Sequence, residues 1–327
     1  MPLPLLIGAA VLLGGVGIKK GVDAKDDFDT AKRLNSKAKN LFDSAKGRLE
    51  KERSQTQSTM ERLGKRKFSV YKEQIIPFVD VFSQIKNLDF KNKELIENGL
   101  SDFNEDELKD LKSNALKMKD VVGGGVASLG AGGLAGMAAY GGVGYVGAAS
   151  TGAAISGLSG AAATNATLAW LGGGSLATGG MGMAGGAAVL GGIVAGPVLA
   201  IGGMMMASKA EEAKHDAYSN VEKAELAAEE MKTAVVATRG IKTRFVEVNE
   251  LLRELEVIFK PQLEKLVNLI SKQKNYAKYT EQQKNDVYLI FQLAVTIKNI
   301  LEAPILTKKG ELNKTTGKLV QTTKKLH

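Results

Sequence analysis

The sequence contains no cysteine, and its only histidines are His215 and His327. Without cysteine the chain has no disulfide, thiol nucleophile or thiolate metal site. His215 lies in a charged helical stretch and His327 in a basic tail that we expect to be mobile, so Ser–His and Cys–His catalysis lack a positioned base. No paired carboxylates or metal-ligand clusters stand out. We therefore expect no enzyme activity, catalytic residue, cofactor or metal site.

A second absence is local, because no charged residue or histidine occurs from Val121 to Ser208. All 44 basic and 35 acidic residues lie outside this segment, which we call the glycine block because it holds 27 of the 38 glycines. A water-exposed domain cannot cover such a length without charge, so the block is buried either in protein or in lipid. We expect it to enter lipid.

Small residues recur every four positions in the glycine block. On a helix, such stripes let backbones touch within lipid, where unpaired amides are costly and enforce helical structure. The stripes comprise Gly132 and Gly136; Ala148, Gly152, Ser156 and Gly160; and Ala184, Ala188, Gly192, Gly196 and Ala200. The polar turn Thr164–Thr167 divides the block into halves that each fit about two spans of roughly 20 residues. Two hairpins, or one deep hairpin with broken helices, are the alternatives. Trp170 suits either an interfacial depth or core packing.

Both flanks of the block carry heptad patterns of small and apolar residues. The later flank predicts one long helix that ends before Pro261. Its seam positions are Ala210, Ala213, Ala217, Asn220, Ala224, Ala227, Met231, Ala234, Thr238, Ile241, Phe245, Val248, Leu252, Leu255 and Phe259. The earlier flank has a shorter seam of Ala24, Phe28, Ala31, Asn35, Ala38, Phe42, Ala45 and Leu49. We expect these two helices to pack on each other.

Caps and apolar periodicity predict the remaining helices. Thr280–Gln283 is a capping box that opens a helix over Val287–Leu301, and Asn104 caps Glu105–Lys119. Further helical pieces are expected at Phe68–Ile85 and Gln262–Lys272. Since no segment shows strand alternation, the predicted fold is all-α, with long flanking helices around a central Gly/Ala-rich hairpin region.

Five segments follow from composition. They are a hydrophobic segment (1–20), a helical domain (21–120), membrane-inserting hairpins (121–208), a coiled-coil domain (209–304) and a basic flexible tail (305–327). The first segment is expected to seek the membrane, with a buried core peptide as the alternative.

Basic residues are concentrated in the first flanking helix. Lys32–Lys67 has a net charge of +8, from twelve basic and four acidic residues. A helix of this kind suits anionic lipid or nucleic acid, and an ordinary solvated face is the alternative.

The segment Ala166–Gly186 has the sequence ATLAWLGGGSLATGGMGMAGG. It resembles bacterial glycine-zipper proteins similar to the apolipoprotein L family, and the helix–glycine block–helix layout agrees over most of the chain. The resemblance implies central hairpins that insert into membranes and conduct ions or permeabilise them, in some bacterial members as death effectors of anti-phage defence. The motif residues that carry over are Leu168, Trp170, Gly172, Gly173, Gly174 and Ser175.

Three functions remain open on these grounds. The leading hypothesis is a membrane-permeabilising protein that is cytoplasmic at rest, is triggered to enter the inner or plasma membrane, and forms homo-oligomers there. An activating protein partner is an open question, and no nucleic acid partner is expected. The second hypothesis is a non-conducting membrane adaptor whose coiled coil recruits a partner such as a membrane-remodelling GTPase. The third is a soluble nucleic-acid or lipid binder that uses Lys32–Lys67.

Overall fold

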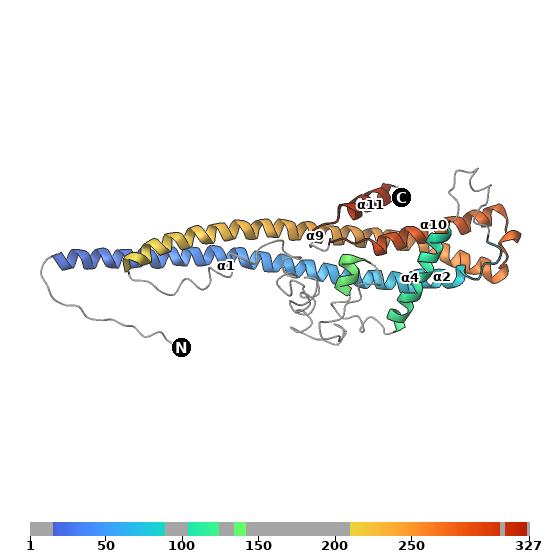
Figure 1. Ribbon diagram of the computed structural model, residues 1–327, viewed down its shortest axis with the longest axis horizontal. Helices are drawn as coiled ribbons and strands as arrows, with labels where there is room; N and C mark the ends of the chain where they lie inside the picture. The colour runs from blue at the N-terminus through green and yellow to red at the C-terminus, as the bar shows by residue number, and fades with distance from the viewer. Residues whose placement is uncertain (1–15, 89–103, 124–133, 142–209, 308–310, 326–327) are drawn as a thin grey trace. The chain divides into compact units, whose positions relative to one another are not determined.

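Figure 1 shows the computed structural model of the chain, which describes residues 16–88, 104–123, 134–141, 210–307 and 311–325. Within these ranges there is no strand, and isolated bridges are the only β pairing, so the all-α prediction is confirmed. A short helix at residues 134–140 carries no label in the figure. The other elements, in chain order, are α1 (Val16–Val70), the π-helical turn η1 (Tyr71–Ile75), α2 (Ile76–Phe82), α4 (Glu105–Gly123), α9 (Ala210–Lys272), the 3₁₀ turn η6 (Tyr276–Lys278), α10 (Glu281–Glu302) and α11 (Lys314–Lys325).

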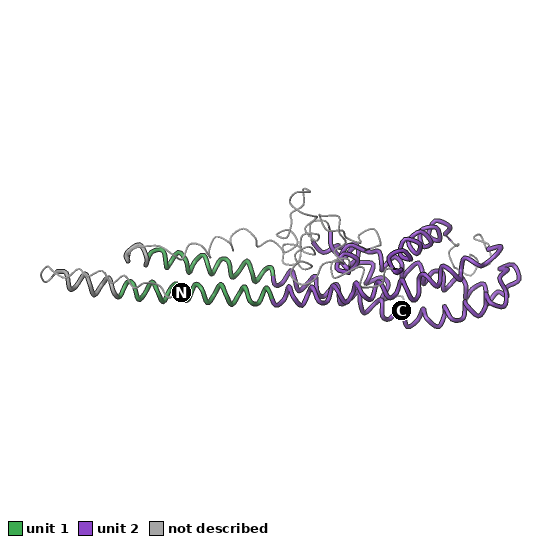
Figure 2. Tube along the Cα trace, turned by 90° about the horizontal axis from the view of Figure 1, so that it is seen from below, with its two compact units in different colours: residues 1–50, 194–234 green, residues 51–193, 235–327 purple. Residues whose placement is uncertain are grey.

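The chain divides into two compact units, which Figure 2 shows in different colours. Unit 1 contains residues 1–50 and 194–234, and unit 2 contains residues 51–193 and 235–327. The long helices α1 and α9 contribute to both units.

Unit 1 is a pair of helices that run in the same direction. Asn220 donates a hydrogen bond of 3.0 Å to Asn35, a residue 185 positions earlier. Lys37 pairs with Glu225 at 3.4 Å across a nearly equal separation of 188 positions. Because the partner on α9 advances as the position on α1 advances, the two helices are parallel. An Asn–Asn pair in a parallel seam specifies register at some cost in stability.

The seam of α9 follows the heptad prediction closely. Every predicted seam position from Ala217 to Phe259 is buried, and the side chains of Ala210 and Ala213 lie outside those that the structure describes. The prediction that this seam packs on the α1 seam is also confirmed, since Ala38 shares a buried cluster with Val221 and Ala224 of α9.

On α1 the predicted seam is correct at its small residues and wrong at Phe28. Ala31, Ala38, Ala45 and Leu49 are buried, whereas 58% of the Phe28 side chain is exposed. Asn35 and Phe42, the remaining seam positions with described side chains, are half-buried, and Phe42 packs against the cluster of Ala38, Val221 and Ala224. The side chain of Ala24 is outside the described set.

The prediction that the later helix ends before Pro261 is wrong. Helix α9 continues through Pro261 to Lys272, so the separate piece expected at Gln262–Lys272 is its last part. The buried face continues from Phe259 to Leu263, Leu266 and Ile270. Burial of these side chains outweighs the roughly 3 kcal/mol that an interior proline costs a helix.

The core of unit 2 gathers the elements around an aromatic cluster. Phe78 lies 5.1 Å from Phe82 and 5.8 Å from Phe259, and Phe82 stacks on Phe291 at 5.5 Å, all between ring centroids. These rings come from α2, α9 and α10, so the cluster fixes three helices on one another. The helical piece expected at Phe68–Ile85 is present as the end of α1, η1 and α2.

The predicted caps of α4 and α10 are confirmed. Thr280 and Gln283 form both hydrogen bonds of a capping box. The carboxamide oxygen of Asn104 accepts bonds from the backbone N–H groups of Asp106 at 2.9 Å and Glu107 at 3.3 Å. The apolar face of α10 is buried, at Val287, Ile290, Phe291, Ala294, Ile297 and Leu301.

Candidate functional site

The structure describes two parts of the glycine block. Val121–Gly123 form the last turn of α4, and residues 134–141 form a short helix and the glycine that follows it. Among the packing residues predicted from the sequence, Gly136 lies in this short helix and is buried. The others fall outside the described residues: Gly132, Gly152, Gly160, Leu168, Trp170, Gly172, Gly173, Gly174, Ser175, Gly192 and Gly196.

Gly64 of α1 lets the short helix approach the backbone of α1. A Cβ atom at this position would overlap the carbonyl group of Leu134, so only glycine fits without movement of the helix. Leu134, Ala135, Met137, Ala138 and Ala139 are all buried in the core of unit 2. Residues 134–141 of the glycine block are therefore enclosed by protein, through the kind of close contact that small residues permit.

Lys67, one turn beyond Gly64, ties the short helix to α10. Its ammonium group donates hydrogen bonds to the carbonyl oxygens of Met137 at 3.2 Å and Leu301 at 2.9 Å. The side chain is fully buried, and this burial lowers the pKa of Lys67 to about 7, although the negative charge of Glu302 acts in the opposite direction. A cation that donates hydrogen bonds to carbonyls at two helix C-termini also interacts favourably with the negative ends of both helix dipoles.

The end of the short helix is held by the segment after α10. The backbone N–H groups of Ile305 and Leu306 donate to the carbonyl oxygen of Ala139 at 2.8 and 2.9 Å. Gly141 has a φ of +69°, the left-handed conformation typical of a glycine that ends a helix. A Cβ atom on Gly141 would also overlap the carbonyl group of Glu302. Residue 141 must therefore be glycine on two separate grounds.

The ionisable groups around Lys67 are also poorly solvated. Burial raises the pKa of the Glu302 carboxyl, although Lys298 bonds it at 3.0 Å and lowers it. Burial and the charge of Glu302 raise the pKa of the Tyr71 hydroxyl, which has no hydrogen-bond partner among the described residues. Tyr71 begins the π-helical turn η1, a type of irregularity that is frequent at functional sites.

We call Gly64, Lys67, Glu302, Ile305 and Leu306 the clasp, because these residues hold residues 134–141 of the glycine block. Sequence reasoning did not identify the clasp. One signal was present, since Lys67 interrupts an apolar face whose other positions are Met60, Leu63 and Tyr71, all fully buried. A charged residue on a buried face indicates a specific partner for that charge.

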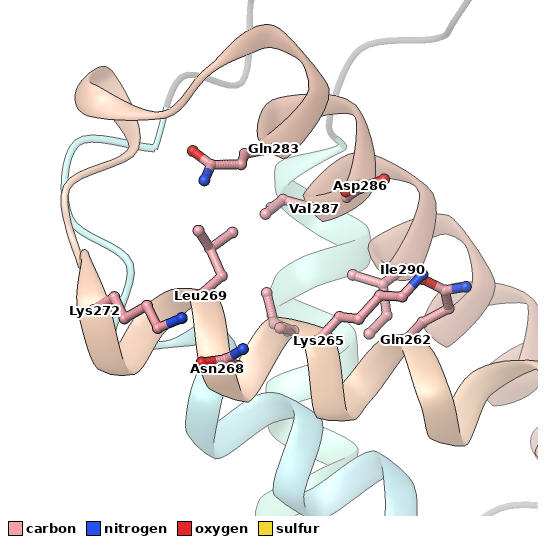
Figure 3. Close-up of a pocket in the computed structure, with 10 residues that line it drawn as sticks. Gln262, Lys265, Asn268, Leu269, Lys272, Gln283, Asp286, Val287 and Ile290 are labelled. Carbon is pink, nitrogen blue, oxygen red and sulfur yellow. The ribbon is translucent and has the colours of Figure 1, made fainter.

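A small cleft lies between α9 and α10 at their junction (Figure 3). Its volume is about 240 Å³, and Leu269 and Val287 face it beside the polar groups of Lys265, Lys272 and Asp286. The cleft contains no nucleophile beside a general base. In the part of the chain that the structure describes, no cluster of three histidine or acidic residues is arranged to hold a metal ion.

None of the described helices is both long enough and apolar enough to cross a bilayer. Comparisons of this chain with protein-family models, with curated proteins and with solved structures find no match.

Proposed function

We propose that this protein is a conditional membrane inserter that permeabilises a bilayer with its glycine block, and that the clasp holds the block in the resting state. The observation that carries the proposal is the enclosure of residues 134–141. This charge-free segment is bound by Gly64 through shape and by Lys67 through a hydrogen bond to the Met137 carbonyl, while a second bond from Lys67 goes to Leu301 of α10. A segment held in this way exposes little apolar surface until the contacts break.

Further support comes from the composition of the block. A hairpin without charged residues crosses hydrocarbon without the roughly 2.5–3.5 kcal/mol that each central charge costs on insertion scales. Its glycine and alanine side chains add little transfer energy of their own, which suits a segment that enters lipid only after release. Oligomerisation through the small-residue stripes, and a role as a death effector in anti-phage defence, belong to the same proposal.

Dye release from vesicles that contain an anionic lipid tests the proposal with the full-length chain. Two variants on α1 form a matched pair. A Cβ at Gly64 overlaps the Leu134 backbone, whereas Gly47 is exposed with no neighbouring atom within 4 Å of an added Cβ. Gly64→Ala should release the short helix and speed leakage by about tenfold, a factor that corresponds to about 1.4 kcal/mol of lost clasp stability. Gly47→Ala should leave leakage unchanged.

Two outcomes would contradict the proposal. Equal leakage from both variants would mean that the clasp does not restrain the glycine block. Vesicle binding without any leakage, from the wild type and from Gly64→Ala alike, would identify a non-conducting adaptor instead. Membrane potential in cells that express the full chain, or a chain lacking residues 121–208, extends the test to living membranes.

A further inference from the structure

A row of basic and polar side chains follows one face of α1 in unit 2. Lys51, Gln55, Ser58, Arg62 and Lys65 recur at alternating intervals of four and three, which places them on one side of the helix. All five are exposed, and no acidic residue occupies a position in the row. This row therefore carries a net positive charge, with Glu61 of α1 as the acidic residue beside it.

The row borders an open groove between α1 and α9. The groove has a volume of about 530 Å³ and is lined by Ser54, Gln55, Ser58, Thr59, Glu61, Arg62, Lys65, Lys242 and Val246. We call this feature the basic groove. Its volume is within the roughly 300–1,000 Å³ range of ligand pockets, but its lining is mainly polar.

The positive charges at the basic groove are only partly compensated. Lys242 pairs with the buried Glu52 and donates a hydrogen bond of 3.0 Å to Gln55. Arg62 bonds the neutral hydroxyl of Thr59 at 3.0 Å. Lys51 and Lys65 form no ion pair with any residue in the described ranges. Cationic donors with unused capacity suit phosphate oxygens.

The groove also has an apolar component. Val246 lines it with 43% of its side chain exposed, and Val257, three turns further along α9, is 68% exposed. No aromatic side chain lines the groove to stack on a nucleic-acid base, as single-stranded binders require. Basic residues beside the exposed Val246 match the two layers of a bilayer surface, which are the phosphates and the acyl boundary beneath them.

From this combination we propose that the basic groove docks unit 2 on the phosphates of an anionic bilayer before the glycine block enters it. The proposal deepens the proposed function, because it assigns the surface that first meets the membrane. Docking would bring the bilayer close to the clasp. It would also make membrane association depend on ionic strength, since exposed charges are screened over about a Debye length.

Binding of the full-length chain to vesicles, measured by flotation, tests this assignment. The vesicles contain either phosphatidylglycerol with phosphatidylcholine or phosphatidylcholine alone. A groove triple of Lys51→Glu, Arg62→Glu and Lys65→Glu is compared with a control triple of Lys112→Glu, Lys265→Glu and Lys278→Glu. All six lysine and arginine side chains are exposed, so both triples make the same change in net charge.

The groove triple should weaken binding to the anionic vesicles by about 100-fold or more, while the control triple changes it by no more than about threefold. Binding to phosphatidylcholine alone should stay weak for all three proteins. Equal losses of vesicle binding in the two triples would show that net charge alone causes the effect, and would overturn the proposal. Tighter binding to a DNA duplex than to anionic vesicles, lost in the groove triple, would assign the groove to nucleic acid.

Flotation separates this proposal from the proposed function. Selective loss of binding in the groove triple, together with a wild type that binds without dye release, would support the docking surface and contradict permeabilisation. Leakage that persists in the groove triple at wild-type rates would support permeabilisation and contradict the docking surface. Circular dichroism of both triples confirms that the helices remain folded.

Discussion

At the scale of single residues, the fold contains a lysine in an apolar site. Lys67 is fully buried, yet the backbone carbonyls of Met137 and Leu301 accept two of its hydrogens. A buried charge is tolerated only with such partners, and removing them leaves it unpaired. The residue therefore both joins the glycine block to α10 and makes that contact sensitive to protonation.

The pH dependence of stability follows from the pKa of Lys67. Burial lowers this pKa to about 7 in the folded state, against an ordinary value of 10.5 in the unfolded chain. Below about pH 7 Lys67 is protonated in both the folded and the unfolded state, and the full cost of burying its charge destabilises the folded state. Above about 10.5 neither state holds the proton, and the destabilisation is absent. Between these values the unfolded state binds more protons, so stability rises with pH.

Lys67→Met should remove this dependence. Between about pH 7 and 10.5, the free energy of unfolding of the wild type should rise relative to that of Lys67→Met, by up to about 1.4 kcal/mol for each pH unit. Denaturant titrations of both proteins at several pH values measure the difference. Glu302 and Tyr71, the other ionisable groups near this site, are present in both proteins and should largely cancel. Parallel profiles would show that Lys67 does not titrate in this window.

The clasp residues show why sequence reasoning did not locate the site. Gly64 stands in a run of charged residues and resembles any helical glycine such as Gly47, and only the short helix against it distinguishes the two. Contacts between residues about 70 positions apart, such as Lys67 with Met137, leave no local pattern. Gly136 was predicted from its four-residue spacing to pack helices within lipid, and that role stays a prediction; in the structure the residue is buried within protein.

At the scale of elements, local patterns predicted helix identity but not helix direction. Heptad spacing identified the seam of α9, and side-chain chemistry identified the caps at Asn104 and Thr280. Neither pattern distinguishes a parallel pair from an antiparallel one. The helix end predicted at Pro261 was wrong because tertiary packing outweighed a local propensity, and the tail expected to be flexible contains helix α11.

Cross-linking tests the parallel pairing in unit 1. The chain has no cysteine, so an introduced pair has no competing thiol. Asn35→Cys with Asn220→Cys should form a disulfide under mild oxidation, because the two side chains are in hydrogen-bond contact. Asn35→Cys with Ala234→Cys should not, since fourteen residues of helix shift the partner by about 21 Å. The opposite result would contradict the parallel register.

At the scale of the whole chain, charge and apolar surface are segregated along the sequence. All charged residues lie outside residues 121–208, and the described flanking helices bury their small and apolar seams against one another. The chain thus combines charged flanking helices with a charge-free segment that we expect to enter hydrocarbon. Residues 134–141, at the near end of that segment, are bound by the clasp.

Trp170 offers the most direct test of the central claim, that the glycine block enters lipid. It is the only tryptophan in the chain and lies within the block, so its fluorescence reports on that segment alone. With anionic vesicles that carry brominated acyl chains, the emission should shift to shorter wavelength and be quenched, more rapidly for Gly64→Ala than for Gly47→Ala. Emission that brominated lipid leaves unchanged, for both variants and the wild type, would contradict the account.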